Sequence, residues 1–134
     1  MKSKIVLFLV FGFITLTIYG QTSKNLEIIE PKDQSLVGQR PIVKGVLTES
    51  NFDVWIIVHP LEVSDFWVQP KAGVKADSTW KAMIHIGRPG SVDIGKLFEI
   101  KAFAGVEIEL YEGKVLNDWP KAKYSSQLIE VTRE

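Results

Sequence analysis

Short apolar runs separated by turn-forming residues constrain the fold of this 134-residue chain more than any other feature. Beyond residue 24 the apolar residues alternate with polar ones or form brief continuous runs, with glycine, proline, asparagine and aspartate between the runs. Such runs, with turn signals about every 8–12 residues, are typical of a β-sandwich or barrel. A parallel α/β sheet is disfavoured, because no segment has a long amphipathic helical period. The predicted strands are Leu26–Glu30, Pro41–Leu47, Val54–His59, Asp65–Gln69, Trp80–Ile86, Leu97–Phe103 and Gln127–Thr132.

The run from Trp80 to Ile86 shows the alternation most clearly. Successive side chains of a strand point to opposite faces, so every second residue shares a face. One face of this run is apolar, and the other carries Lys81 and His85 and should face solvent. The residues of this run that we expect in the core are Trp80, Ala82, Ile84 and Ile86.

The run Val54–Val58 has no polar side. Such a strand either has both faces covered or carries a functional apolar surface. The segment Gly105–Ser125 contains several large apolar residues, and loops of this length are often packed lids or binding loops. We therefore expect this segment to fold back over the outer sheet face that holds Trp55, Ile57 and Phe103.

The N-terminus has the features of a secretory signal peptide. Two lysines precede the uncharged apolar run Ile5–Tyr19, and Gly20 ends it before a polar stretch. A positive start, an apolar centre of about 7–15 residues and a small residue at the exit define such signals. We predict that residues 1–20 are a helical signal peptide cleaved near Gly20, and that residues 21–134 form one domain. An uncleaved membrane anchor is the alternative, since a spanning helix needs about 17–25 apolar residues.

Composition excludes several classes of function. The chain has no cysteine, which excludes disulfide and thiolate chemistry. Its 16 basic and 16 acidic residues are interspersed, whereas non-specific nucleic-acid binding needs clustered lysine and arginine. We therefore expect no nucleic-acid partner, and we expect membrane contact only through residues 1–20 if these are not cleaved.

The residues of catalytic type form no recognisable constellation. His59 and His85 are the only histidines, and they lack the His-x-x-x-His spacing of a zinc site. No serine lies in the Gly-x-Ser-x-Gly elbow that exposes a nucleophile. We therefore predict no catalytic, metal-binding or cofactor-binding residue. A small envelope hydrolase that uses His59 or His85 with a neighbouring carboxylate is the enzymatic alternative.

Aromatic residues are the best candidates for ligand contact. Trp67 directly follows another aromatic residue in a short strand, so one of the two rings must point away from the main core. We predict that Trp67 and Trp119 form a ligand-contacting surface, with Gln69 as a polar partner. His59, at the end of a strand, is a further ligand-binding candidate. The alternative is that both tryptophans lie under the long segment, since tryptophan is usually largely buried.

Several short motifs resemble those of bacterial immunoglobulin-like modules. The run Ile28–Val37 is similar to the opening strand of that family, and Val43–Gly45 is similar to its Val-x-Gly strand. The turn Asp77–Trp80 and the final strand Ile129–Thr132 extend the resemblance over nearly all of the predicted domain. The resemblance implies an antiparallel Greek-key sandwich of about seven strands on an envelope or extracellular protein, and it transfers no catalytic residue. The insertion Val106–Ser125 has no place in the common pattern.

Together these features predict an all-β, immunoglobulin-like module that is secreted or periplasmic, or anchored through residues 1–20. Its expected role is non-catalytic binding of an envelope or extracellular protein, peptide or glycan, without a cofactor. A structural subunit that assembles by strand addition is a second alternative. An exposed, unpaired edge strand at Leu26–Glu30 or Asp65–Gln69 would favour that alternative.

Overall fold

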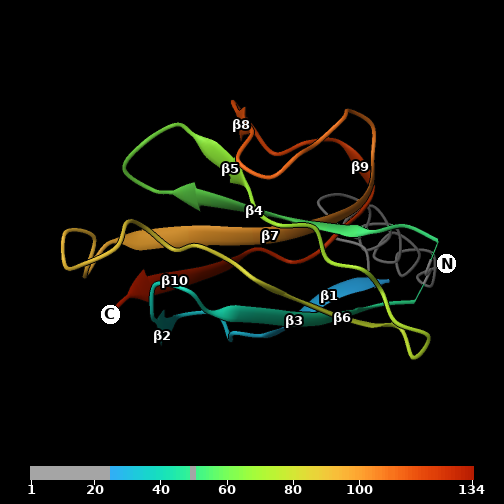
Figure 1. Cartoon of the computed structure of the whole chain (residues 1–134), viewed down its shortest axis with the longest axis horizontal. Helices are drawn as coiled ribbons and strands as arrows, with labels where there is room; N and C mark the ends of the chain where they lie inside the picture. The colour runs from blue at the N-terminus through green and yellow to red at the C-terminus, as the bar shows by residue number, and fades with distance from the viewer. Residues whose placement is uncertain (1–24, 49–50) are drawn as a thin grey trace, which may run out of the picture.

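The computed structural model describes residues 25–48 and 51–134 (Figure 1). Every regular element in these ranges is a β-strand, so the all-β prediction is confirmed. The predicted signal peptide and the alternative anchor, residues 1–20, lie outside the described residues. Within the described ranges, no helix has the length and apolar character needed to cross a membrane. The strands are β1 (Leu26–Glu30), β2 (Ser35–Val37), β3 (Ile42–Leu47), β4 (Val54–Pro60), β5 (Phe66–Val68), β6 (Thr79–Met83), β7 (Leu97–Val106), β8 (Val115–Leu116), β9 (Ala122–Ser125) and β10 (Ile129–Arg133).

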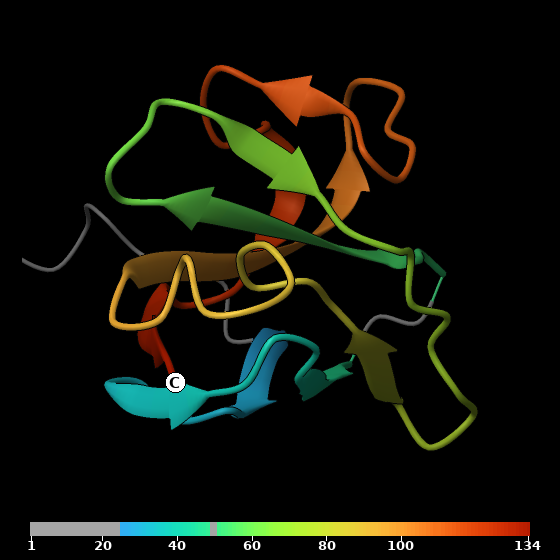
Figure 2. The same cartoon turned by 60° about the vertical axis from the view of Figure 1, so that its left-hand side comes forward.

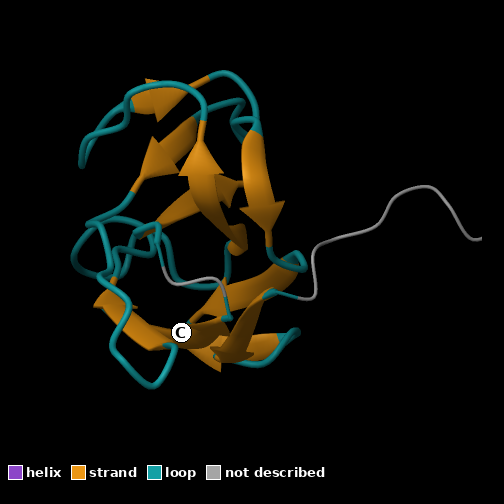
Figure 3. Ribbon diagram, turned by 90° about the vertical axis from the view of Figure 1, so that its right-hand side faces the viewer, coloured by secondary structure: helices purple, strands orange, loops and turns teal. Residues whose placement is uncertain are grey.

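The strands form two sheets that face each other (Figures 2 and 3). A three-stranded antiparallel sheet has the order β1-β3-β6. A seven-stranded sheet has the order β2-β10-β7-β4-β5-β8, and its seventh strand, β9, pairs with β7 outside this path. The long strand β7 pairs with β4 along one side. Along its other side it pairs first with β10 and then with β9. The β2–β10 pair is parallel, which corrects the prediction of an antiparallel sandwich. The short strand β2 pairs with the last strand of the chain, a partner that local alternation does not reveal.

The predicted core face is confirmed for the run from Trp80 to Ile86. Its four apolar residues are buried between the sheets, while Lys81 and His85 on the other face are exposed. Partners from both sheets complete this core, as the facing surfaces of a sandwich require. The core comprises Leu26, Ile28, Val37, Val43, Leu47, Val54, Ile56, Val58, Ala72, Trp80, Ala82, Ile84, Ile86, Phe98, Ile100, Ala102, Ala104, Ile129 and Val131.

Trp80 packs its ring against a glycine. Strand β3 pairs with β6 so that Gly45 lies opposite Trp80. A Cβ atom on Gly45 would collide with the indole ring of Trp80 and with the backbone oxygen of Glu27 in β1. The glycine of the Val43–Gly45 motif therefore makes room for the largest fully buried side chain of the core.

A second apolar layer covers the outer face of the seven-stranded sheet. Ile57 of β4 and Phe103 of β7 belong to this layer and are 0% and 2% exposed. Trp119, from the segment 105–125, packs against them, and Trp55 is half-buried in the same layer. The prediction that this segment folds back over the sheet is confirmed. This cover explains why β4 is apolar on both faces.

Candidate binding cleft

A cleft of about 960 Å³ lies between the β4–β5 hairpin and the loop 87–96. The hairpin contributes Trp67, and the loop contributes Arg88, Asp93 and Lys96. In Figure 2 the loop, coloured yellow to gold, lies between the hairpin and β2. The volume is near the upper end of the range of about 300–1,000 Å³ that is usual for ligand sites.

Trp67 is the aromatic residue of this cleft. In β5, Phe66 and Val68 point into the buried outer layer, so Trp67 points to the opposite face of the sheet. The side chain is 41% exposed, although tryptophan is usually largely buried. Three apolar residues that are themselves exposed also line the cleft, namely Leu61, Val63 and Leu97.

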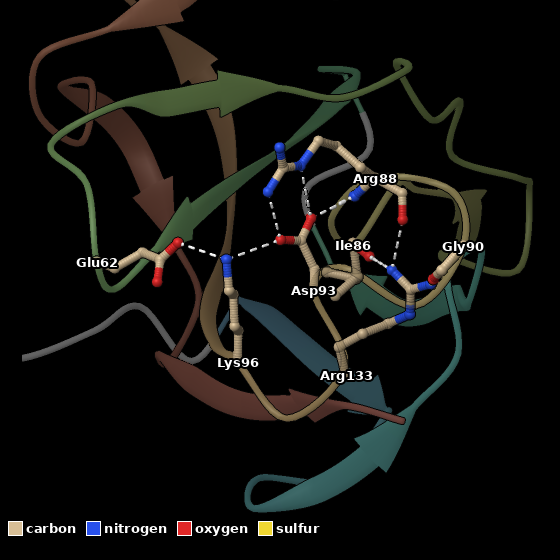
Figure 4. A network of polar contacts seen from close by, with 7 residues as sticks. All are labelled: Glu62, Ile86, Arg88, Gly90, Asp93, Lys96 and Arg133. Carbon is tan, nitrogen blue, oxygen red and sulfur yellow. Dashed lines mark hydrogen bonds and ion pairs between the residues drawn. The ribbon is translucent and has the colours of Figure 1, made fainter.

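Asp93 organises the loop that forms one wall of the cleft (Figure 4). Its carboxylate side chain is 7% exposed and accepts hydrogen bonds from the Arg88 backbone N–H (2.7 Å) and guanidinium (2.9 and 3.2 Å). The Nζ atom of Lys96 lies 3.0 Å from the same carboxylate and 2.9 Å from Glu62 in the hairpin turn. This chain of ion pairs links the two walls of the cleft.

Arg133 of β10 holds the same loop. Its buried guanidinium donates hydrogen bonds to the carbonyl oxygens of Ile86 (2.8 Å), Arg88 (2.9 Å) and Gly90 (2.7 Å). The guanidinium is planar and presents its N–H donors in a fixed fork, so the three carbonyls are held in one arrangement. The loop 87–96 is therefore held by the contacts of Asp93 within the loop and by those of Arg133 from strand β10.

The Asp93 network predicts a loss of stability in acid. Hydrogen bonds from the Arg88 side chain, followed by those from its backbone N–H and from Lys96, hold the pKa of Asp93 well below its usual range. Because the folded-state pKa is depressed, the stabilisation is complete above the unfolded-state pKa of about 3.9 and is lost as the pH falls toward the folded-state value. We expect the thermal unfolding midpoint to fall between about pH 5 and pH 2, and Asp93→Asn to flatten this fall.

The matched control is Asp53→Asn, which removes a half-exposed ion pair with Lys71 on another part of the surface. Differential scanning calorimetry at several pH values measures the midpoint. The control should keep the acid profile of the unmodified protein. An unchanged profile in the Asp93→Asn variant would contradict the assigned role of this carboxylate.

Gln69 supports the wall of the cleft. Its side chain is almost fully buried, and its Oε1 atom accepts a hydrogen bond from the backbone N–H of His85 (2.8 Å). Its Nε2 atom donates to the backbone oxygen of Trp67 (3.3 Å). Both ends of the amide have partners within the protein, and Gln69 lines the cleft together with Trp67. Its role as a polar partner of a ligand stays a prediction.

Trp119 lies on the other face of the sheet. Its ring centroid is 4.8 Å from that of Phe66 and 5.9 Å from that of Phe103, and the Nζ atom of Lys101 is 5.8 Å from the ring. Because Phe66 and Trp67 point to opposite faces of β5, Trp119 and Trp67 do not share a surface. The predicted two-tryptophan surface is therefore not formed, and Trp119 belongs to the outer layer.

His59 also lies on the outer face, at the end of β4. Its ring stacks on Phe66 with centroids 4.0 Å apart. Its Nδ1 atom lies 2.9 Å from a carboxylate oxygen of Glu99, and its Nε2 atom lies 2.8 Å from the backbone oxygen of Val63. Both ring nitrogens thus face protein oxygens, and His59 is not among the residues that line the cleft around Trp67. His85 lines the cleft, whereas His59 lies on the outer face of the seven-stranded sheet, so the two histidines do not share a site.

The sequence interpretation missed the residues that hold the loop. The sequence Gly87–Gly90 indicates only a turn, although Arg88 within it forms an ion pair with Asp93, five residues later. The alternation of opposite charges over Arg88, Asp93 and Lys96 was a usable signal for this network. Arg133 offered no local signal, because the carbonyls it binds lie 43 to 47 residues away.

Across residues 25–48 and 51–134, no group of three or more His, Cys, Asp or Glu side chains is arranged to hold a metal ion.

Comparison of the chain with protein-family models, curated proteins and solved structures found no match.

Proposed function

We propose that the chain is an exported, non-catalytic binding module of the bacterial cell envelope with an immunoglobulin-like fold. The observation that carries the proposal is Trp67, 41% exposed in a cleft of about 960 Å³ whose walls are joined by ion pairs. A concave site with an exposed aromatic ring, apolar neighbours and a few fixed polar groups is typical of ligand recognition. The proposed partner is a protein, a peptide or a glycan of the envelope or extracellular space.

The strand order supports the immunoglobulin-like assignment. In immunoglobulin-like sandwiches, strands A, B and E share one sheet, while strands G, F and C are neighbours in the other. Here β1, β3 and β6 form one sheet, and β10, β7 and β4 are consecutive neighbours in the other. The additional strand β5 beside β4 corresponds to the extra strand of the variable type. The segment 105–125 is the departure from this pattern.

The geometry of His59 favours a structural role over the hydrolase alternative. The distance of 2.9 Å between its Nδ1 atom and Glu99 is that of a catalytic pair. However, its Nε2 atom faces the backbone oxygen of Val63, and Phe66 stacks on the ring. A general base needs a nitrogen within reach of the substrate proton, and neither nitrogen of His59 is directed into the cleft.

The edge strands give the strand-addition alternative little support. Strand β5 is paired on both sides, with β4 and with β8. At β1, the side chain of Gln127 accepts a hydrogen bond from the Ile28 N–H (3.1 Å) and donates one to the Ile28 oxygen (2.7 Å). The Gln127 amide thus occupies the backbone N–H and oxygen of Ile28 in the middle of this edge, and an added strand would need these two groups for pairing.

The export prediction has a direct test. If residues 1–20 form a signal peptide, the protein isolated from the envelope fraction or the medium should begin near Gln21. Mass spectrometry of the intact protein measures its N-terminus. An intact N-terminus in the membrane fraction would support the anchor, and an intact chain confined to the cytosol would contradict export.

Replacing Trp67 with alanine should weaken partner binding about thirty-fold. A central tryptophan of an interface contributes about 2 kcal/mol or more, and each 1.4 kcal/mol corresponds to about a factor of ten. Isothermal titration calorimetry with envelope peptides and glycan fragments measures the affinity, and circular dichroism checks the fold. Leu36→Ala is the control, since Leu36 is 63% exposed and lies outside the cleft. An equal effect of both substitutions would contradict a binding role for the cleft.

A further inference from the structure

We propose that the cleft recognises a basic segment of another protein, an extended peptide whose lysine or arginine side chain lies over Trp67. This inference rests on the binding function proposed above and names the chemistry of the ligand. It follows from the charge of the cleft, from the surroundings of Trp67 and from the combination of apolar and acidic groups in the lining.

The cleft carries an excess of acidic groups. Four carboxylates and two basic side chains line it. The two basic side chains are already paired with two of the acids in the network around Asp93. The other two, Asp65 and Glu112, are exposed, and in the described part of the chain neither has an ion pair. A positively charged ligand can form ion pairs with these two carboxylates, whereas a neutral glycan cannot.

Trp67 also differs from other aromatic residues of this protein. A lysine ammonium lies 5.8 Å from the ring centroid of Trp55, 5.6 Å from that of Tyr111 and 5.8 Å from that of Trp119. Over residues 25–48 and 51–134, no lysine or arginine takes the corresponding position at Trp67. Tryptophan attracts a cation more strongly than other aromatic residues do. Its exposed ring can therefore accept a cationic side chain of the ligand.

The remaining lining suits the rest of a basic peptide. Lysine and arginine have an apolar stem below the charged group, and Leu61, Val63 and Leu97 offer apolar contact within the same cleft as Trp67. In an extended peptide, alternate side chains point in opposite directions, so apolar and basic residues can meet different walls. The volume of about 960 Å³ accommodates more than a single amino group.

A nuclear magnetic resonance titration of the isotopically labelled protein tests this inference. The indole N–H signal of Trp67 is assigned by its disappearance in a Trp67→Phe variant. The first probe is a capped pentapeptide that alternates valine and lysine, with matched peptides that carry glutamine or glutamate in place of lysine. We expect the lysine peptide to shift the Trp67 signal and to bind at least about tenfold more tightly than the glutamine peptide. Raising the salt from about 0.05 to 0.5 M should weaken this binding.

Variants of the two unpaired acids provide a second measurement. Asp65→Asn and Glu112→Gln should each lower the affinity for the lysine peptide by up to about five-fold, the range of exposed ion pairs. Both side chains are exposed, so the fold should be retained. The matched control is Glu27→Gln, which removes an exposed acid of β1 outside the cleft. This control should leave the affinity unchanged.

Titration with a neutral N-acetylglucosamine oligomer, as a further probe, distinguishes failure of this inference from failure of the proposed binding function. Equal affinity for the lysine and glutamine peptides, or a Trp67 signal that the lysine peptide does not shift, overturns the inference. If the oligomer shifts the Trp67 signal and the lysine peptide does not, the basic ligand is excluded while the binding function stands. If no probe shifts the signal, the inference fails, and the alanine substitution of Trp67 decides the binding function separately.

Discussion

Replacing Gly45 with alanine should lower the free energy of unfolding by about 3 kcal/mol or more, the upper range for overpacking of a core. The new Cβ atom would collide with the ring of Trp80 and with the backbone oxygen of Glu27. Trp80 is 2% exposed and enclosed by both sheets, and Glu27 belongs to a strand that is paired with β3. Neither neighbour can therefore move without disturbing the core. Urea denaturation followed by circular dichroism measures the change.

Gly38→Ala is the matched control for this substitution. A Cβ atom at Gly38 meets no atom within 4 Å, so the expected change is within about 0.5 kcal/mol. A Trp80→Leu substitution added to Gly45→Ala should give a non-additive double variant, because the residues touch. Similar stability of the Gly45→Ala and Gly38→Ala variants would contradict the close packing of Trp80 against β3.

Replacing Arg133 with methionine should cost about 3 kcal/mol of stability and should also weaken ligand binding. Methionine keeps an apolar stem but removes the donors to the carbonyl oxygens of Ile86, Arg88 and Gly90. A buried acceptor left without its donor costs about 1–3 kcal/mol. The loop 87–96 forms one wall of the cleft, so its loss of order should lower the affinity as well. Urea denaturation and calorimetric titration measure the two effects.

Two further variants separate the geometry of Arg133 from its charge. Arg133→Lys keeps the charge but not the planar fork, so it should be intermediate in stability. Arg40→Met removes an exposed arginine and should change the free energy of unfolding by less than about 0.5 kcal/mol. If Arg133→Met behaved like Arg40→Met, the guanidinium would not be the support of the loop.

Side-chain alternation made the main strands and the core face predictable. Each of the seven predicted strands has a counterpart, and the run from Trp80 to Ile86 is buried on the expected side. The apolar run Val54–Val58 predicted a covering layer, because a strand that is apolar on both faces needs cover on both. The strands β2, β8 and β9 were not predicted; each has two to four residues, and unlike the equally short β5 none of them carries two adjacent aromatic residues.

The candidate cleft could be predicted only in part. Trp67 was identifiable because two adjacent aromatic residues in one strand cannot share a face. The positions of Trp119 and Gln69 depend on which face of the sheet the long segment covers and on a hydrogen bond to His85, sixteen residues away. The loop is held by Arg133 at the far end of the chain. Contacts between distant residues follow from the completed sheet pairing, which alternation alone does not specify.

Site-specific photo-crosslinking in the living cell tests the central claim most directly. A photoreactive amino acid is placed at Val63, inside the cleft, or at Leu128, outside it, and both positions are 44% exposed. We predict a discrete crosslinked product from Val63 that is lost when Trp67→Ala is added, and no such product from Leu128. Equal products from both positions, or none from Val63, would contradict a binding function for the cleft.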